Sequence, residues 1–582
     1  MRSLFTCCVL LTSFFLASCV VLSAQSGSTK FEKSGGTQTP AYPEIISWWQ
    51  QLDQQSGKVR MLSMGMTDAG FPLHLVIISE NGDSDFEAVR KRNKRIILIN
   101  NGIHPGEPDG IDASMLLARD IVAKKYTLPA NIVLAIIPVY NIGGCLNRSA
   151  DYRVDQNGPE EFGFRGNSQN LDLNRDFIKA DSRDARAFTE IFQLLNPDVF
   201  VDNHVSNGAD YQHVMTLITS QHNKLGEVMG EFMHNQFEPA LFTIMKDKGY
   251  DLAPYVNFWG GSKVEDGWQE FWDSPRYGSG YAALWNCFSF IPETHMLKPY
   301  LQRVQSTYAL MQSFIEFTSA NSEKIRDTRE RARQATMAAS SFPVKWMADK
   351  EKFRKITFRG YESGSRISNV SGLPRLYYDR TKPFVMDIPF YDGYKSTGSV
   401  TAPKAYIIPQ GWWKVIELLR LNKVSMRSFR ADTTIEVEVY HIDEYKSAPR
   451  PYEGHHPNTD VKLHTTVEKV TYRKGDYYIP MNQPANRFLV ETLEPQAEDS
   501  YFSWNFFDGI LGQKEGYSAY AFEDIAADYL KSQPAIREGL EKRRAADSSF
   551  AKSASAQLNY VYQQSKWFEP SYLRYPVTRV VK

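Results

Sequence analysis

The sequence predicts an α/β fold with a largely parallel central sheet in its first half and a β-rich region in its second half. Between about residues 43 and 320, short apolar runs alternate with helical segments, and this alternation favours a parallel sheet. Beyond residue 340, apolar and polar residues alternate with a period of two, as in residues 435–440, which is typical of half-buried strands. A chain of 582 residues has room for about two to four domains.

Apolar runs and helical spacing predict the elements of the first half in order. Residues 96–100 form a short apolar run that Asn101 and Gly102 end, as expected for a buried strand. A helix is predicted from Asp109, because apolar residues then recur at spacings of four, three and four. Further strands are expected at 132–139, 199–201 and 288–292, and a further helix at 183–195.

Changes in composition suggest the boundaries between parts of the chain. Residues 25–42 are polar and rich in Gly, Ser and Thr, so they are interpreted as a linker to the main domain at 43–320. A charged helical linker is expected at 321–339, followed by the β-rich accessory region at 340–582. Within that region, helices are expected only near 412–421 and 521–531.

The first 24 residues resemble a secretory signal peptide. Arg2 is the only charge among the first 29 residues, and the stretch from Leu4 to Leu22 is apolar or small before the chain turns polar. Residues 16–19 also resemble a bacterial lipoprotein box with Cys19 as the lipidated residue, while plain cleavage near residue 24 and an uncleaved anchor are alternatives. We therefore expect an exported protein, either periplasmic or attached to the membrane as a lipoprotein through Cys19.

Charge and cysteine content exclude two classes of protein. The 67 Lys and Arg balance the 67 Asp and Glu, so the chain lacks the basic excess that nucleic-acid binding requires, and no nucleic-acid partner is expected. Beyond the N-terminal segment only Cys145 and Cys287 remain, which cannot form a disulfide framework or a cysteine metal site. Whether these two cysteines form a single disulfide bond with each other is left open.

Two motifs at the ends of predicted strands indicate a metal site. His104 and Glu107 share a tight Pro-Gly loop after the strand 96–100, and His204 ends the strand that starts at Val199. Carboxyl ends of strands in α/β sheets border ligand crevices, and two histidines with one carboxylate form an open zinc site. His213 and His222 are weaker alternatives to His204, since neither ends an apolar strand beside an Asp.

Two further motifs supply groups that act on a substrate. Asn174 and Arg175 lie in the segment 170–177, and a guanidinium beside an amide suits bidentate capture of a carboxylate. Glu293 ends an apolar strand, where a carboxylate is costly unless it is paired or used, for example as general base on a zinc-bound water. The motifs of zincins, serine hydrolases and P-loop proteins are absent from the sequence.

The ordered set H-x-x-E, D-x-N-R, strand-end His and strand-end Glu resembles the M14 family of zinc carboxypeptidases over about residues 43–320. The resemblance implies an α/β/α sandwich around a mixed, largely parallel eight-stranded sheet. It implies one zinc ion per chain, held by His104, Glu107 and His204. Glu293 would then be the general base and acid of a peptidase.

The resemblance also implies how the substrate is held. Asn174 and Arg175 would bind the terminal carboxylate of a peptide, and Asp172 would orient the first zinc histidine. The family also has an Arg that polarises the scissile carbonyl, for which Arg165 is the first choice. Arg153 and Arg148 are the alternatives.

Two features of the resemblance leave substrate choice open. The mobile Tyr of the family corresponds to either Tyr277 or Tyr281, and Asp176 stands where the family usually has Asn, which adds a negative charge near the carboxylate pocket. The principal hypothesis is a carboxypeptidase whose partner is a peptide with a free C-terminal carboxylate. The alternatives are an M14-like amide hydrolase or deacylase acting on cell-wall peptides or acyl-amino acids, and a non-catalytic glycan-binding lipoprotein suggested by aromatic pairs such as Trp412-Trp413.

Overall fold

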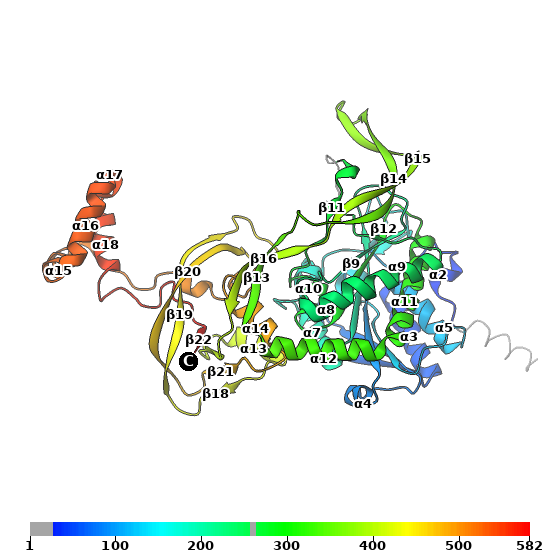
Figure 1. Ribbon diagram of the computed structural model, residues 1–582, viewed down its shortest axis with the longest axis horizontal. Coiled ribbons are helices and arrows are strands. Elements are labelled where there is room, and N and C mark those ends of the chain that lie inside the picture. The colour runs from blue at the N-terminus through cyan, green and yellow to red at the C-terminus, as the bar shows by residue number, and fades with distance from the viewer. Residues whose placement is uncertain (1–26, 257–262, 582) are drawn as a thin grey trace, which may run out of the picture. The chain divides into compact units, whose positions relative to one another are not determined.

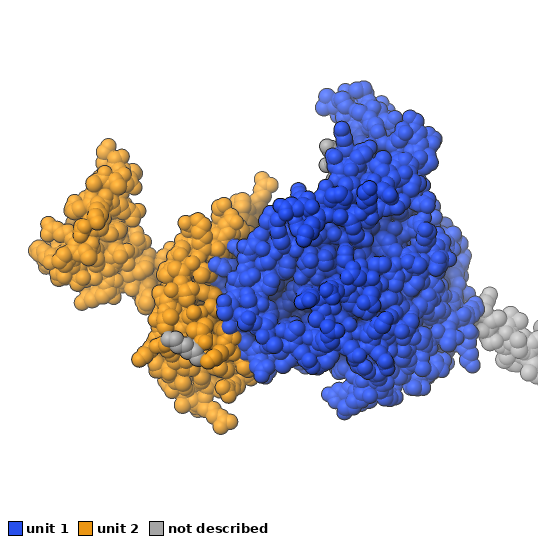
Figure 2. Space-filling view, in the orientation of Figure 1, with its two compact units in different colours: residues 1–402, 417–425, 481–499 blue, residues 403–416, 426–480, 500–582 orange. Residues whose placement is uncertain are grey.

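The computed structural model describes residues 27–256 and 263–581, which fall into two compact units. Of these described residues, unit 1 contains those up to residue 402 together with 417–425 and 481–499, and unit 2 contains the rest (Figure 2). The expected signal peptide and Cys19 lie outside the described residues. Within the part that the structure covers, no helix has the length and apolar character needed to cross a membrane.

Unit 1 is built on a mixed sheet of nine strand segments in eight positions (Figure 1). The order is β1-β2-β4-β3-β7-β12-β9-β10, and β8 continues the line of β7, because both segments pair with β12 in parallel. The pairs β3–β4 and β3–β7 are also parallel, whereas β1–β2, β2–β4 and β9–β12 are antiparallel. The strands are β1 Val59–Met66, β2 Pro72–Ile78, β3 Arg95–Asn100, β4 Ile132–Ile137, β7 Val199–Asp202, β8 His204–Ser206, β9 Met215–Thr219, β10 Ala253–Pro254 and β12 Phe288–His295.

Helices cover both faces of this sheet, which completes the expected α/β/α sandwich. On one face, Ile97 and Ile99 of β3 join a core with helices α5 and α11. On the other, the Phe200 ring of β7 packs 5.6 Å from Phe188 and 6.2 Å from Phe192 of α7, between ring centroids. The helices of unit 1 before residue 340 are α2 Lys30–Lys33, α3 Tyr42–Gln55, α4 Phe86–Lys91, α5 Asp109–Val122, α6 Ile142–Leu146, α7 Arg183–Leu195, α8 Gly226–Phe232, α9 Glu238–Asp247, α10 Gly278–Ala283, α11 Tyr300–Ala320 and α12 Ser322–Ala338.

The buried strands explain why the sequence pattern found them. Every residue of β3 and β4 is buried, because helices pack on both faces, and such strands consist of continuous apolar runs. The segment 25–42 differs from the expected linker. Thr29 and Glu32 form a capping box at the start of α2, and the Phe31 side chain is buried in the same core as α3 and α5.

The region beyond residue 340 contributes to both units, so the chain does not divide at the expected boundary. The strands β13 Ser341–Ala348, β14 Arg354–Ile367, β15 Pro374–Tyr391 and β16 Tyr394–Thr401 belong to unit 1. β14 and β15 form a long hairpin, and β15 pairs with β11 Trp268–Gln269 from the first half of the chain. Helix α14 Asn486–Leu493 also belongs to unit 1, where Asn486 Nδ2 hydrogen-bonds to backbone carbonyls at the end of α12.

Unit 2 contains a six-stranded sheet in the order β18-β21-β17-β22-β19-β20, as expected for a β-rich region. The helix expected near 521–531 is present as α15, but it is one of four helices that form a cluster with its own core of Phe522, Leu540, Phe550 and Leu558. Their short amphipathic segments are helical because they pack on one another. The elements are β17 Ala405–Ile408, β18 Arg427–Ser428, β19 Thr433–Ser447, β20 Asn458–Tyr472, β21 Tyr477–Pro480, β22 Thr578–Val580, α15 Ala519–Ser532, α16 Pro534–Ala546, α17 Ser548–Ala551 and α18 Ala554–Gln563.

The two cysteines among the described residues are both free. Cys145 lies in α6 and Cys287 directly precedes β12, and both are buried. The disulfide that the sequence left open is therefore not formed. Burial raises the pKa of each thiol to about 12, so both stay protonated near neutral pH and are packing residues rather than nucleophiles.

The packing of α2 predicts that Phe31→Ala destabilises unit 1. Truncation of a buried Phe leaves a cavity and costs about 3–5 kcal/mol in the free energy of unfolding. Lys33→Ala, an exposed change in the same helix, should cost no more than about 0.5 kcal/mol. Urea unfolding followed by intrinsic fluorescence compares the two variants, and equal midpoints would show that residues 25–42 are a linker after all.

Candidate metal centre and substrate cleft

A tight turn after β3 presents His104 and Glu107 on the same side. Gly102 adopts a positive φ of 64°, which suits glycine, and the Glu107 N–H donates to the His104 carbonyl at 2.8 Å. Both side chains are buried. The apolar strand thus ends in a loop whose polar side chains turn inward at the carboxyl edge of the sheet.

His204 reaches the same point from the neighbouring strand line. Asn203 interrupts β7, and His204 then opens β8 and pairs in parallel with Glu293 of β12. The Val205 N–H donates to Glu107 Oε2 at 2.9 Å, which ties this strand to the loop after β3. Three residues from two distant segments therefore meet in one buried place.

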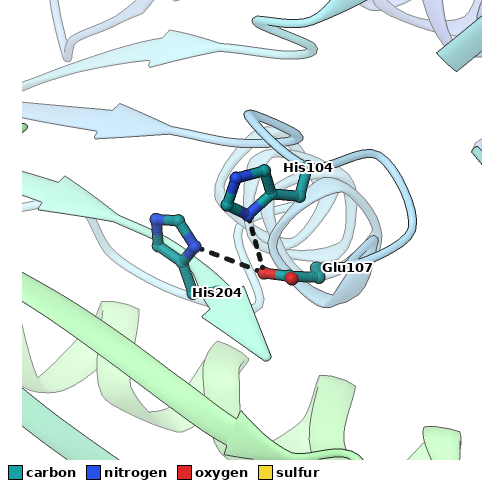
Figure 3. A group of neighbouring side chains, drawn as sticks. All are labelled: His104, Glu107 and His204. Carbon is teal, nitrogen blue, oxygen red and sulfur yellow. Dashed lines mark hydrogen bonds and ion pairs between the residues drawn. The ribbon is translucent and has the colours of Figure 1, made fainter. Parts of the chain in front are cut away.

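The ring nitrogens of both histidines point at one carboxylate oxygen (Figure 3). Glu107 Oε2 lies 3.4 Å from His104 Nδ1 and 3.2 Å from His204 Nδ1. One donor atom from each residue lies within 4.8 Å of the other two, and no other group of three such donors meets among the residues that the structure describes. The structure thus brings together the three residues that the sequence analysis grouped as metal ligands.

The far nitrogen of each ring faces a carboxylate, and this arrangement fits a metal. His104 Nε2 lies 2.9 Å from Asp172 Oδ1, and His204 Nε2 lies 3.2 Å from Asp202 Oδ2. A carboxylate beside each Nε2 can accept its N–H, which would leave the Nδ1 lone pairs, on the side of Glu107, for a bound metal ion. Two imidazole nitrogens and one carboxylate oxygen form the protein donor set of an open, tetrahedral zinc site.

The Asp202 contact was missed by the sequence analysis, although a signal was present. Asp202 precedes His204 by two residues in an extended segment, and side chains two residues apart in a strand point to the same face. The predicted partner of the first histidine, Asp172, does contact His104. Burial opposes ionisation of Asp172, but the charges of His104 and Arg165 lower its pKa below the ordinary value and keep it an acceptor.

Arg153 and Arg165 both face the metal centre, whereas Arg148 does not. Arg153 Nη1 lies 2.8 Å from Glu107 Oε1. Arg165 donates through Nε and Nη2 to Asp172 Oδ2 at 3.1 and 2.8 Å, and its side chain is 45% exposed in the cleft. Arg148 instead donates to backbone carbonyls outside the cleft lining. Arg165 and Arg153 thus stay candidates for the oxyanion, and Arg165 is the more accessible.

Glu293 lines the cleft beside His204, its register partner on β8. Burial raises the pKa of this carboxyl to about 8, and the nearby negative charge of Glu107 adds to the effect, while His204 and Arg165 oppose it. A carboxyl with a pKa in this range can both accept and donate a proton near neutral pH.

Asn174 and Arg175 lie in a short 3₁₀ turn, Leu173–Arg175, and both line the cleft. The Arg175 guanidinium lies 4.6 Å from the centroid of the Tyr277 ring, which also lines the cleft. Tyr281 is fully buried and donates to Asn422 Oδ1 at 2.6 Å. Of the two tyrosines, only Tyr277 is therefore placed to touch a substrate.

The Asp176 carboxylate is paired inside the protein and does not line the cleft. Its Oδ1 pairs with Lys179 Nζ at 2.7 Å, and its Oδ2 accepts from the Ser182 backbone and hydroxyl. Asp176 and Lys179 are both buried, and neither lines the cleft. The negative charge that Asp176 brings in place of the expected Asn is therefore balanced by Lys179 inside the protein.

The cleft has a volume of about 590 Å³, and apolar side chains form part of its wall. Ile218 of β9 and Ile291 of β12 are register partners on this wall, and Tyr255 and Phe271 complete it. The weaker histidine candidates lie elsewhere, since His213 hydrogen-bonds to the Asp251 carbonyl and to the Arg359 N–H, and His222 stacks on His234.

Comparison with known proteins gives a family match for this part of the chain. Residues 45–262 match the family described as zinc carboxypeptidase, Peptidase M14. No curated protein matches the sequence.

Solved structures resemble about half of the chain. A metallo-carboxypeptidase from Burkholderia cenocepacia is 16% identical over 47% of this chain and 69% of its own, with a TM-score of 0.36. A metallo-carboxypeptidase from Pseudomonas aeruginosa is 13% identical over 49% of this chain and 69% of its own, with a TM-score of 0.35. Bovine thrombin-activatable fibrinolysis inhibitor is 13% identical over 49% of this chain and 99% of its own, with a TM-score of 0.35.

The donor geometry predicts one bound zinc per chain and a role for Asp202 in holding it. His104→Ala and His204→Ala should abolish stoichiometric zinc after dialysis, because two donors cannot replace three. Asp202→Ala should weaken zinc affinity about 10- to 100-fold, since the ring of His204 loses the carboxylate that faces its Nε2. Elemental analysis and competition with a fluorescent chelator measure these changes.

His213→Ala is the matched control, because His213 is buried outside the centre. It should retain full zinc content. Wild-type zinc content in both the His104 and the His204 variants would contradict the assigned site.

Proposed function

We propose that this protein, whose residues 45–262 match the zinc carboxypeptidase family M14, removes the C-terminal residue of peptides by hydrolysis. The observation that carries the proposal is the position of Glu293, beside a convergent His-Glu-His donor set and in the same cleft as Arg175. A metal centre, an acid–base group and a cation for the substrate carboxylate are thereby combined in one site.

His104, Glu107 and His204 would hold one zinc ion. When bound, zinc would acidify a water molecule and polarise the scissile carbonyl. Asp172 and Asp202 lie beside the Nε2 atoms of the two imidazoles and would favour the tautomer that this binding requires. Arg153 holds the second oxygen of Glu107 and so fixes the orientation of its carboxylate.

Glu293 is assigned the proton transfers. Its carboxylate would accept a proton from the attacking water and later deliver that proton to the nitrogen of the leaving amine. Arg165 would donate hydrogen bonds to the oxyanion that develops on the carbonyl oxygen, a form of stabilisation that is worth most where water is excluded. Its tie to Asp172 keeps the guanidinium in position before the substrate arrives.

Asn174 and Arg175 would bind the terminal carboxylate of the substrate. Tyr277 covers the Arg175 guanidinium and limits its freedom, which favours a fixed binding geometry. The wall of Ile218, Ile291 and Phe271 carries no charge, so the site favours an apolar or aromatic C-terminal side chain over a charged one. Export of the chain remains a proposal supported by the N-terminal sequence.

Glu293→Gln tests the proton transfers. The amide keeps the shape of the side chain but cannot accept the proton, so kcat should fall about 10²- to 10⁴-fold while zinc content stays at one per chain. Glu227→Gln, an exposed change on α8, is the control and should leave kcat unchanged. Near-normal turnover by Glu293→Gln would refute the assignment.

Arg175→Gln tests recognition of the C-terminus. The wild type should cleave peptides ending in Phe or Leu far faster than those ending in Lys or Glu, and should not act on the amidated forms. Loss of a charge-assisted contact should lower kcat/KM for the free acids about 10- to 100-fold, mainly through KM.

The peptide panel also distinguishes the alternative activities. Cleavage of acyl-amino acids or cell-wall peptides in preference to every plain peptide would favour the amide hydrolase. Equal rates on free and amidated C-termini would contradict the proposed role of Arg175.

A further inference from the structure

The hairpin of β14 and β15 projects from the body of unit 1, and its distal half has no covering layer (Figures 1 and 2). The two strands remain paired out to Ile367 and Pro374, and residues 368–373 form the tip. Most residues from 362 to 376 are exposed on both faces of the ribbon. A two-stranded ribbon of this kind has little stability of its own in water, so its exposed side chains call for an explanation.

The tip exposes an unusual amount of apolar surface. Val370 is 98% exposed, Leu373 65%, Ile367 64% and Leu376 47%. Single exposed apolar residues are common on protein surfaces, but a cluster at one convex point is typical of a surface that another molecule covers.

Strand pairing sorts the side chains of the distal hairpin onto two faces. Arg366 and Arg375 are register partners, so they lie on one face, where Arg366 also lies 5.2 Å from the centroid of the Tyr377 ring. Ile367 and Leu376 lie on the opposite face by the same alternation. The ribbon thus combines an apolar face and an apolar tip with a cationic face.

The charge of this segment has one sign only. Residues 363–378 contain Arg366 and Arg375 and no Asp or Glu. Two acidic residues flank this segment as register partners: Glu362 pairs with Lys382 at 3.2 Å, and Asp379 accepts hydrogen bonds from the Thr381 N–H and hydroxyl.

We propose that the distal β14–β15 hairpin docks unit 1 on an anionic lipid bilayer, with Val370, Leu373 and Ile367 in the headgroup boundary and Arg366 and Arg375 at the lipid phosphates. When the tip is inserted in the bilayer, the aliphatic part of each arginine side chain can lie along the tip while its guanidinium stays at the charged membrane surface. A stable protein partner needs about 800 Å² of surface from each side, which a narrow convex tip supplies poorly. The lipids of a fluid bilayer can instead rearrange to surround such a tip.

Vesicle binding tests the proposal. The chain from residue 25 onward, without the apolar N-terminal segment, is sedimented with 100-nm vesicles of phosphatidylcholine alone or with about one quarter phosphatidylglycerol. We expect binding to the anionic vesicles, weaker binding to the neutral ones, and a several-fold loss of the anionic preference in 0.5 M salt, where charges are strongly screened.

Two double variants separate the apolar and the cationic contributions. Val370→Asp with Leu373→Asp should lower the lipid partition coefficient at least about tenfold. The apolar contact is lost, and the two new carboxylates cancel the positive charge of Arg366 and Arg375. Arg366→Gln with Arg375→Gln should remove the difference between anionic and neutral vesicles. Val467→Asp, at a residue 61% exposed on β20 of unit 2, is the matched control and should bind as the wild type does.

Circular dichroism and thermal melting check that each variant is folded, so the test does not depend on peptidase activity. No vesicle binding by the wild type, or equal binding by wild type and the Val370/Leu373 variant, would overturn the proposal. A wild-type dimer in solution that this variant dissociates, without vesicle binding by either, would assign the tip to a second copy of the chain and would equally overturn it.

Discussion

The convergence of three polar groups on one oxygen of Glu107 holds the centre of this protein together. Both histidine Nδ1 atoms and the Val205 N–H point at Oε2, which joins the loop after β3 to the start of β8. A buried carboxylate is tolerable only when several donors or a cation satisfy it. Burial alone would raise its pKa, but the charges of His104 and Arg153 lower it, so the group stays ionised as a ligand must.

The sheet makes this convergence possible. The strands β3, β7 and β12 are parallel neighbours, so their carboxyl ends bring polar residues to one edge of an otherwise apolar layer. The interruption at Asn203 matters, because β8 then continues the line and sets His204 directly beside Glu293. Ligand and acid–base group are therefore fixed by backbone pairing rather than by a flexible loop.

Much of this arrangement followed from the sequence. Strands buried on both faces are continuous apolar runs, and the ligands stand immediately after them, so β3, β7 and β12 and the three donors could be predicted together. Asp202 was missed although it lies two residues from His204. The packed segment around Phe31 was taken for a linker, and the helices that follow α15 were not predicted, because their stability comes from contacts with residues distant in the chain.

The sequence by itself determined the chemistry that is available: which residue types end which strands, and that two histidines and a carboxylate can meet. Only the tertiary structure decided which nitrogen of each ring faces inward, that Arg148 and Tyr281 point away from the cleft, and that Lys179 neutralises Asp176. The physical reason is the range of the interactions. Periodicity and strand ends are local properties of the chain, whereas ring orientation, burial and ion pairing depend on groups that only folding brings together.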